Sequence, residues 1–268
     1  MQATMIDDPE DPRIAAYRDI RERDLVGRDG LFVAEGKVVL EKLAGSESCR
    51  LQSLLVAEKR LDRLAPIIAT LPDDVAVYAA PQTIIDQVAG FPLHRGIIGI
   101  GRRSETPSAE ALLASISDSP GDILVLSAIA NHDNMGGIFR NAAAFGARAV
   151  LLDPDCCDPL YRKAIRVSVG ATLLVPFARL DRREDPLSLL DRHDYSPVAL
   201  SPSGRTELAQ YRPSSKNALW LGAEGPGLAP EWLERMNSVR IAMAGSFDSL
   251  NVATTSGIVL HHLRAGRF

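Results

Sequence analysis

From residue 123 onward the sequence alternates apolar strand-like runs, short polar loops and helix-like segments, and this alternation constrains the fold more than any other feature. Residues 123–130 (ILVLSAIA) form a continuous apolar run, which is typical of a strand buried on both faces of a parallel sheet. The same pattern predicts further strands at residues 149–152, 173–176, 198–201, 218–222 and 238–243, and helices at 138–145, 161–167 and 186–192. We therefore expect a C-terminal parallel α/β sheet with helices on both faces.

Two other regions precede this alternation. Residues 1–105 are predicted to form a small α/β domain, in which Asp11 and Pro12 begin a helix that continues to about residue 25. Residues 106–121 are rich in Ser, Pro and small residues, a composition typical of a linker, and their middle is predicted to be helical. The chain is thus predicted to consist of an N-terminal domain (1–105), a linker (106–121) and a C-terminal domain (122–268).

Charge and composition exclude several classes of protein. A net charge of −4 and a pI near 5.8 argue against a protein that coats nucleic acid non-specifically, so any such contact must come from a local patch. No apolar run approaches the roughly 18 to 20 residues of a membrane span, and the acidic start does not resemble a secretory or mitochondrial leader. We expect a cytoplasmic protein with no membrane partner, whose three cysteines are reduced and structural.

The first of three polar loops follows the apolar run at 123–130. Asn134 is placed to cap the next helix, and the two glycines after Met135 allow close approach of a ligand or another backbone. Arg140 extends from the same end of the helix. The alternative for this loop is a helix cap with a surface arginine.

The second loop, LWLGAEGPGLAP at residues 219–230, continues directly from a buried strand. Its glycine-rich turn leaves backbone N–H and C=O groups free to hydrogen-bond a flat heterocycle. Glu224 is its only charged residue, and it would either bind a hydroxyl or amino group or remain solvated.

The third loop ends in Ser249-Leu250-Asn251, just before the last helix. We expect Asp248 or Ser249 to be the N-cap of that helix, and an ordinary cap is the alternative to a functional site. Because the carboxyl ends of parallel strands share one edge of a sheet, the three loops together predict a single site.

In order and spacing, these loops resemble the three motifs of the SpoU (TrmH) family of the SPOUT superfamily, which are S-adenosylmethionine-dependent RNA 2′-O-ribose methyltransferases. The resemblance lies in N-x5-R of the first loop, LG-x-EG-x-GL of the second and SLN-V-A of the third, and in RVSVGA at residues 166–171. Residues 31–61, with FVAEG near their start, resemble the ribosomal-protein-like substrate-binding domain of that family.

The resemblance implies a deep trefoil knot in the C-terminal sheet, which is rare among proteins, and a homodimer formed through the C-terminal domain, with apolar contacts from residues 228–233. It implies S-adenosylmethionine as cofactor and RNA as substrate, with ribosomal RNA favoured over transfer RNA. The residues that match the family's catalytic and substrate positions are Asn134, Arg140, Glu224, Ser249 and Asn251. The resemblance assigns cofactor binding to Leu221, Gly222, Ile241, Met243 and Leu250.

Two residues depart from the family pattern: Ala223 stands where the second motif usually has Asn, and Ala242 where the third usually has Pro. Because a guanidinium has a pKa above about 12, we expect Arg140 to hold a phosphate and orient the hydroxyl rather than act as a base. A candidate RNA patch, for which a solvated helix face is the alternative, consists of Arg162, Lys163 and Arg166.

Other chemistries find little support. The histidines lack partner ligands at metal spacing, so no metal site is predicted, and no GxSxG nucleophile elbow occurs. Two hypotheses remain: an RNA ribose 2′-O-methyltransferase, and a non-catalytic RNA- or ribosome-binding protein that keeps the same fold. The joint presence of the residues at catalytic positions favours the enzyme.

Overall fold

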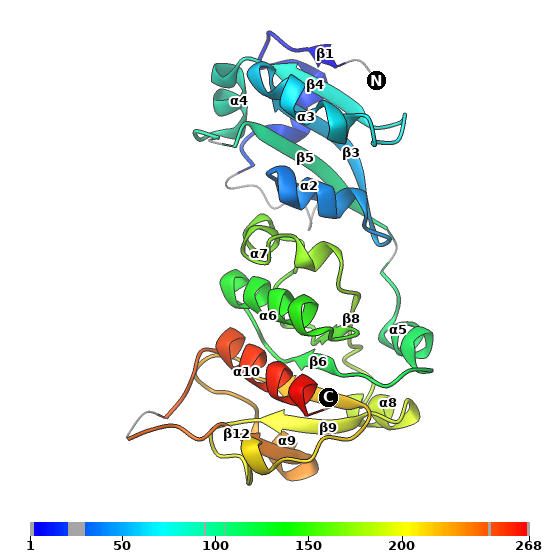
Figure 1. Ribbon diagram of the computed structural model, residues 1–268, viewed down its shortest axis with the longest axis vertical. Helices are drawn as coiled ribbons and strands as arrows, with labels where there is room; N and C mark the ends of the chain where they lie inside the picture. The colour runs from blue at the N-terminus through cyan, green and yellow to red at the C-terminus, as the bar shows by residue number, and fades with distance from the viewer. Residues whose placement is uncertain (1–2, 21–29, 94, 105, 246–247, 267–268) are drawn as a thin grey trace. The chain divides into compact units, whose positions relative to one another are not determined.

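The computed structural model describes residues 3–20, 30–93, 95–104, 106–245 and 248–266 (Figure 1). The chain divides into two compact units, one comprising Met1–Glu105 with Leu160–Leu174 and the other Thr106–Pro159 with Val175–Phe268. The first unit therefore includes a segment, 160–174, that lies within the C-terminal part of the sequence. No helix within the described ranges is long and apolar enough to cross a membrane.

The first unit is built on a mixed sheet with the strand order β1-β4-β3-β5-β2. β1, β4 and β3 are parallel, whereas β5 is antiparallel to both β3 and β2. The strands are β1 (Thr4–Met5), β2 (Leu31–Glu35), β3 (Cys49–Ala57), β4 (Ala76–Ala80) and β5 (Ile97–Arg103). The helical segments are η1 (Pro12–Tyr17), α2 (Lys37–Ala44), η2 (Glu58–Arg60), α3 (Leu61–Ile68), α4 (Gln82–Ala89), α7 (Arg162–Val167) and η3 (Ala171–Leu173).

The second unit is built on a sheet with the order β10-β12-β9-β11-β6-β7-β8, and all neighbouring strands in this order are parallel. Its strands are β6 (Ile123–Leu126), β7 (Val150–Leu152), β8 (Phe177–Arg179), β9 (Ser196–Leu200), β10 (Thr206–Glu207), β11 (Asn217–Leu221) and β12 (Asn237–Arg240). Its helical segments are α5 (Ala109–Ile116), α6 (His132–Phe145), α8 (Pro186–Arg192), η4 (Leu208–Gln210), α9 (Pro230–Arg235) and α10 (Val252–Ala265).

Helices cover both faces of this parallel sheet, as the sequence predicts. Alternate strand residues such as Val125 and Trp220 share one core cluster with Leu113 of α5 and Leu189 of α8. On the other face, α6 and α10 pack side by side (Figure 1). α5 occupies the middle of the segment predicted as a linker, where a helix was expected, and it buries Leu113 in the core of the second unit.

Several predicted element positions are wrong. α6 begins at His132 rather than at 138, because Asn131, and not Asn134, is its N-cap: the Asn131 Oδ1 accepts the Asp133 N–H at 2.8 Å. The predicted strand at 173–176 is replaced by the end of η3 and a turn before β8. α10 begins at Val252, and its cap is not Asp248 or Ser249.

Glycines inside α6 explain the first of these errors. Gly136 and Gly137 suggest a loop, yet they lie in the first turns of the helix. A Cβ atom at Gly137 would come within 2.7 Å of the Ala253 Cβ on α10, so the missing side chain allows the two helices to approach closely. In the first unit, the Asp11 cap and Pro12 start are confirmed, but η1 ends at Tyr17, and the predicted extension beyond residue 20 lies outside the described residues.

Candidate functional site

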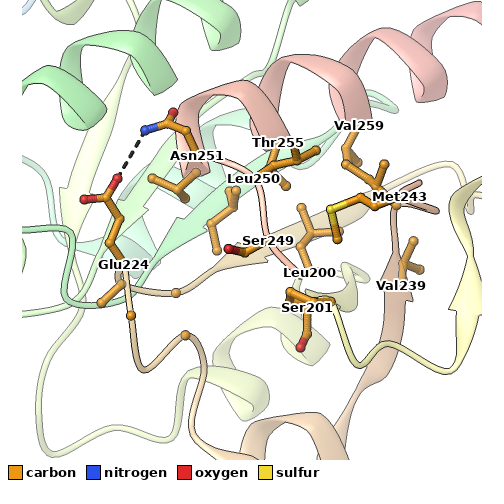
Figure 2. A pocket seen from close by; sticks show the side chains of 18 residues that line it. Leu200, Ser201, Glu224, Val239, Met243, Ser249, Leu250, Asn251, Thr255 and Val259 are labelled. Carbon is orange, nitrogen blue, oxygen red and sulfur yellow. Dashed lines mark hydrogen bonds between the residues drawn. The ribbon is translucent and has the colours of Figure 1, made fainter. Parts of the chain in front are cut away.

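A pocket of about 410 Å³ lies at the carboxyl ends of β9, β11 and β12, which are neighbours in the parallel sheet. The loops that follow these strands line it together with the first turns of α10. Figure 2 shows Glu224 and Asn251 at one end of the pocket and Met243, Val239 and Val259 at the other. One end is therefore polar and the other apolar, an arrangement common in small-molecule sites.

A tight turn after β11 forms one wall of the pocket. Ala223 and Gly227 face each other as a short antiparallel bridge, in which the Gly227 N–H donates to the Ala223 oxygen at 3.1 Å. A Cβ atom on Gly222 would lie 2.4 Å from the Gly227 carbonyl carbon and 2.5 Å from the Leu228 nitrogen, so a larger residue would displace backbone. Gly225 has a φ of +87°, which favours glycine for conformational reasons. The turn therefore depends on its glycines.

Asn251 is the residue at which all three predicted loops meet. It is the N-cap of α10, because its Oδ1 accepts the N–H groups of Ala253 at 2.9 Å and Thr254 at 3.1 Å. Its Nδ2 donates to the Asn134 Oδ1 at 2.8 Å and to the Glu224 Oε1 at 3.1 Å, and Figure 2 shows the second of these bonds. The backbone of α10 thus orients one end of the amide, and the other end joins the first and second loops.

A second hydrogen-bonded link holds α6 against α10. The Asn141 Nδ2 donates to the Ala253 carbonyl oxygen at 2.6 Å and to the Ser256 Oγ at 3.0 Å, and Ser256 is fully buried. The sequence analysis did not single out these two residues. The signal that would have found Asn141 is its spacing of seven from Asn134, which puts both amides on one face of α6.

The predicted catalytic residues fall into three groups. Glu224, Ser249 and Asn251 line the pocket and are exposed. Asn134 is buried and accepts a hydrogen bond from Asn251. Arg140 is exposed on α6 and is not among the residues that line the pocket, and its side chain has no hydrogen bond or ion pair with any described residue.

All five predicted cofactor residues line the pocket: Leu221, Gly222, Ile241, Met243 and Leu250. Leu250 is 38% exposed, which is unusual for a large apolar side chain and leaves it available to a ligand. The pocket also has a wall that was not predicted, at the end of β9 and on the inner face of α10, formed by Leu200, Ser201, Pro202, Val252, Thr255 and Val259. Because β9 was predicted, the strand-end rule would have indicated the residues after it.

The candidate RNA patch on α7 lies in the first unit, and its members differ in their surroundings. The Arg162 Nη2 is 2.8 Å from the Glu35 Oε2, with side chains 19% and 12% exposed, and the Arg162 guanidinium carbon is 4.4 Å from the centre of the Phe91 ring. Arg162 is therefore engaged within its own unit. Lys163 and Arg166 are exposed.

The residues predicted as a dimer contact are used within the chain. Leu228 is buried in the core of the second unit, Trp232 and Leu233 pack against that core, and the Trp232 ring stacks on Trp220 with centroids 4.9 Å apart. These side chains stabilise α9 against the sheet, so their apolar character has an explanation that involves no partner subunit.

Cys156, which lies next to the first loop, is held by hydrogen bonds to the backbone. The Cys156 Sγ accepts the Ile129 N–H and donates to the Leu126 oxygen, each at 3.3 Å, and burial raises the pKa of this thiol to about 12. Among the described residues, no three His, Cys, Asp or Glu side chains gather in a way that could hold a metal ion.

Comparison with known proteins identifies the family. The sequence model of the SpoU rRNA Methylase family matches residues 122–261. The chain belongs to this family. The match confirms the resemblance drawn from the three loops, and it spans the pocket-forming strands and most of α10.

Relatives of the SpoU chain extend the match to its N-terminal part. It is 35% identical over 97% of its length to an "uncharacterized tRNA/rRNA methyltransferase" of Mycobacterium bovis, 93% of which is covered. It is 30% identical over 79% of its length to the 23S rRNA (guanosine-2′-O-)-methyltransferase RlmB of Escherichia coli, 88% of which is covered.

Solved structures share the fold. An AdoMet-bound rRNA methyltransferase from Sinorhizobium meliloti has a TM-score of 0.83 at 22% identity, with 100% of both chains covered. An RNA 2′-O ribose methyltransferase has a TM-score of 0.76 at 26% identity, with 98% of this chain and 99% of that chain covered.

Proposed function

We propose that this SpoU protein transfers a methyl group from S-adenosylmethionine to a ribose 2′-hydroxyl of structured RNA, with ribosomal RNA as the substrate class. The observation that carries the proposal is the pair of hydrogen bonds from the Asn251 amide to Asn134 and Glu224, which brings these residues together at the edge of a ligand-sized pocket. The E. coli relative, a 23S rRNA 2′-O-methyltransferase by name, supports the choice of RNA and of reaction.

The pocket fits the proposed cofactor. Its volume of about 410 Å³ lies in the range typical of small-molecule sites, and its walls combine apolar side chains with the backbone of a glycine turn. Leu221, Gly222, Ile241, Met243 and Leu250 would hold the cofactor. When bound, it supplies an activated methyl group on a sulfonium.

Arg140 is proposed to bind the RNA phosphate beside the target ribose. A guanidinium is a planar cation with several N–H donors and no acceptor, so Arg140 is suited to binding a phosphate and orienting the hydroxyl rather than to removing a proton. Its exposure and its lack of a partner among the described residues leave all five of its N–H donors available.

Glu224, Ser249 and Asn251 are proposed to position the ribose at the edge of the pocket. Among the described residues, only Asn251 donates a hydrogen bond to the Glu224 carboxylate, which therefore retains acceptor capacity toward a hydroxyl. In such a site most of the rate acceleration comes from alignment and exclusion of water.

Three further features follow from membership of the family. We infer a deep trefoil knot in the second unit, a homodimer formed through that unit, and an RNA-binding role for the N-terminal unit. Support for the knot is the strand order, in which β9, β11 and β12 lie side by side and α10 returns onto α6. Support for the RNA-binding role is that the relative from M. bovis matches almost the whole chain.

Calorimetric titration with S-adenosylmethionine and S-adenosylhomocysteine tests the cofactor site. We expect micromolar binding by the wild type and none by Leu250→Arg, because a charged side chain would enter the apolar part of the pocket. Ile258→Arg is the matched control: Leu250 and Ile258 are 38% and 39% exposed, but Ile258 does not line the pocket. Absence of binding by the wild type would favour the non-catalytic RNA-binding alternative.

Substitution of Arg140 tests the division of roles. Arg140→Ala should abolish methyl transfer to ribosomal RNA while leaving S-adenosylmethionine affinity and stability near wild-type values, because the side chain neither lines the pocket nor bonds to a described residue. Arg140→Lys, which keeps the charge but not the planar fork, should restore RNA affinity more than turnover. Equal loss of cofactor binding and turnover in Arg140→Ala would refute the assignment.

A further inference from the structure

A second pocket, of about 680 Å³, lies in the first unit and is rich in arginine. β3 contributes Arg50 and Gln52, the end of β5 contributes Arg102 and Arg103, and Asp74 lies just before β4. Three guanidinium groups against one carboxylate give the lining a net charge of +2. In a chain whose net charge is −4, such a local excess of positive charge marks a place where an anion would be attracted.

The register of the sheet brings two of these arginines together. Arg50 and Arg102 are direct partners in the antiparallel pair of β3 and β5, so their side chains project from the same face. Both side chains are exposed, and neither guanidinium has a hydrogen bond or ion pair with any described residue. Like charges directly opposite each other destabilise a sheet, and an anion between them would remove that penalty.

Beside these arginines, no strand among the described residues pairs with β3 on the side that β4 occupies farther along. β4 pairs with β3 over residues 53–57, whereas β5 pairs with β3 from Cys49 onward, so β3 extends past the end of β4. A register shift between Leu51 and Ser53 makes Gln52 the extra residue of a β-bulge, and its side chain is exposed. The guanidinium groups are thus accompanied by an amide side chain and by a part of β3 with which β4 does not pair.

We propose that this pocket binds the phosphodiester backbone of the RNA substrate, with Arg50 and Arg102 each contacting a phosphate. The assignment rests on the proposed function, because it takes RNA as the substrate. Arginine binds phosphate through two parallel N–H donors, and contacts of this kind position a nucleic acid without reading its sequence. The size of the pocket and the part of β3 with which β4 does not pair suit a polymer of phosphates better than one small anion.

The salt dependence of RNA binding tests the proposal. Each phosphate contact lowers the slope of log K against log salt by about 0.7 for single strands and about 0.9 for duplexes. The double variant Arg50→Ala/Arg102→Ala should therefore have a slope shallower by about 1.4 to 1.8, which corresponds to about 25-fold to 60-fold weaker binding at 0.1 M salt. Fluorescence anisotropy of a labelled RNA stem-loop measures both quantities across a salt series.

A matched control separates local contact from net charge. Arg182→Ala/Arg183→Ala removes the same charge from exposed positions that line neither pocket, and it should leave affinity and slope close to wild type. The Tm of the Arg50→Ala/Arg102→Ala variant should not fall, because the substitution removes a repulsive pair. Equal slopes for the two double variants would overturn the proposal.

Two further outcomes are informative. If inorganic phosphate binds the wild type but not Arg50→Ala/Arg102→Ala in a calorimetric titration, while both proteins bind the stem-loop equally, the pocket is a small-anion site and the RNA assignment is wrong. S-adenosylmethionine titration of all three proteins monitors the second unit independently. Failure of the wild type to bind cofactor would contradict the proposed function, whereas the anisotropy result would still decide the role of the arginine pocket.

Discussion

Asn251 has two structural roles that different substitutions separate. Its amide oxygen caps α10, and its amide nitrogen joins Asn134 to Glu224. Asn251→Ser keeps an oxygen that is suited to the cap but has no amide donor to reach the two partners. Asn251→Ala removes both roles. Comparison of the two variants therefore isolates the contribution of the cap.

The expected losses of stability follow from the burial of each partner. Loss of the cap costs about 1 kcal/mol. Asn134 is only 5% exposed, so leaving its Oδ1 without a donor costs about 1–3 kcal/mol. Glu224 is exposed, and water replaces the bond that it loses. Asn251→Ala should thus destabilise the second unit by about 2–4 kcal/mol, and Asn251→Ser by about 1 kcal/mol less.

Urea unfolding followed by tryptophan fluorescence measures these losses in the relevant unit, because both tryptophans of the chain, Trp220 and Trp232, stack on each other there. Both Asn251 variants should also lose methyl transfer, since Asn134 and Glu224 are no longer tied together. Equal destabilisation by Ser and Ala would show that the cap contributes nothing. Wild-type turnover by Asn251→Ser would refute the importance of the two hydrogen bonds from the amide nitrogen.

Three other substitutions test separate parts of the molecule. Gly222→Ala should lose S-adenosylmethionine binding in a calorimetric titration, because its Cβ would lie 2.4 Å from backbone. Gly45→Ala in the first unit, where φ is −96° and a Cβ would meet only backbone oxygens at 3.9 Å, should bind like the wild type. Equal affinities of the two variants would contradict this account of the turn. Arg162→Ala should lower the free energy of unfolding of the first unit by about 1–3 kcal/mol, because it leaves the Glu35 carboxylate, which is 12% exposed, without its partner. Arg166→Ala should change the same free energy by less than about 0.5 kcal/mol. Urea unfolding followed by circular dichroism distinguishes the two variants, and matching values would show that the ion pair is not structural. Burial raises the pKa of the Cys156 thiol to about 12 in the folded unit, whereas an unfolded thiol has a pKa of about 8.5. Between these values only the unfolded chain loses the proton, so the free energy of unfolding should fall as pH rises, by up to about 1.4 kcal/mol per pH unit. Cys156→Ala should lessen that slope, and an unchanged slope would show that the thiol does not contribute.

The parts of the fold that follow from local pattern were predictable. Apolar runs such as the one that becomes β6 and the alternation with amphipathic segments lead directly to the parallel sheet of the second unit. α8 begins and ends where it was predicted, because Asp185 caps it and Pro186 opens it. Gly146 ends α6 in the left-handed conformation that a C-cap glycine favours.

The errors arise where tertiary packing overrides a local signal. Gly136 and Gly137 suggest a loop by composition, but the close approach of α10 makes glycine useful inside α6. Asn131 and Asn134 are equally good caps in isolation, and only the position of the helix start decides between them. The N-cap of α10 is Asn251 rather than Ser249, and the Asn251 side chain also hydrogen-bonds to Asn134 and Glu224 across the site. Such partners cannot be read from one segment.

The arginines of the chain differ in a way that bears on how an acidic protein binds RNA. Arg162 has a carboxylate partner and an aromatic neighbour, so using it to bind phosphate would first require breaking a part-buried ion pair. The side chains of Arg50, Arg102 and Arg140 are exposed and have no hydrogen bond or ion pair with a described residue, so they can bind phosphate without losing an existing contact. Guanidinium groups left without partners in a chain of net charge −4 are therefore better candidates for RNA contact than the basic cluster on α7 that the sequence suggests.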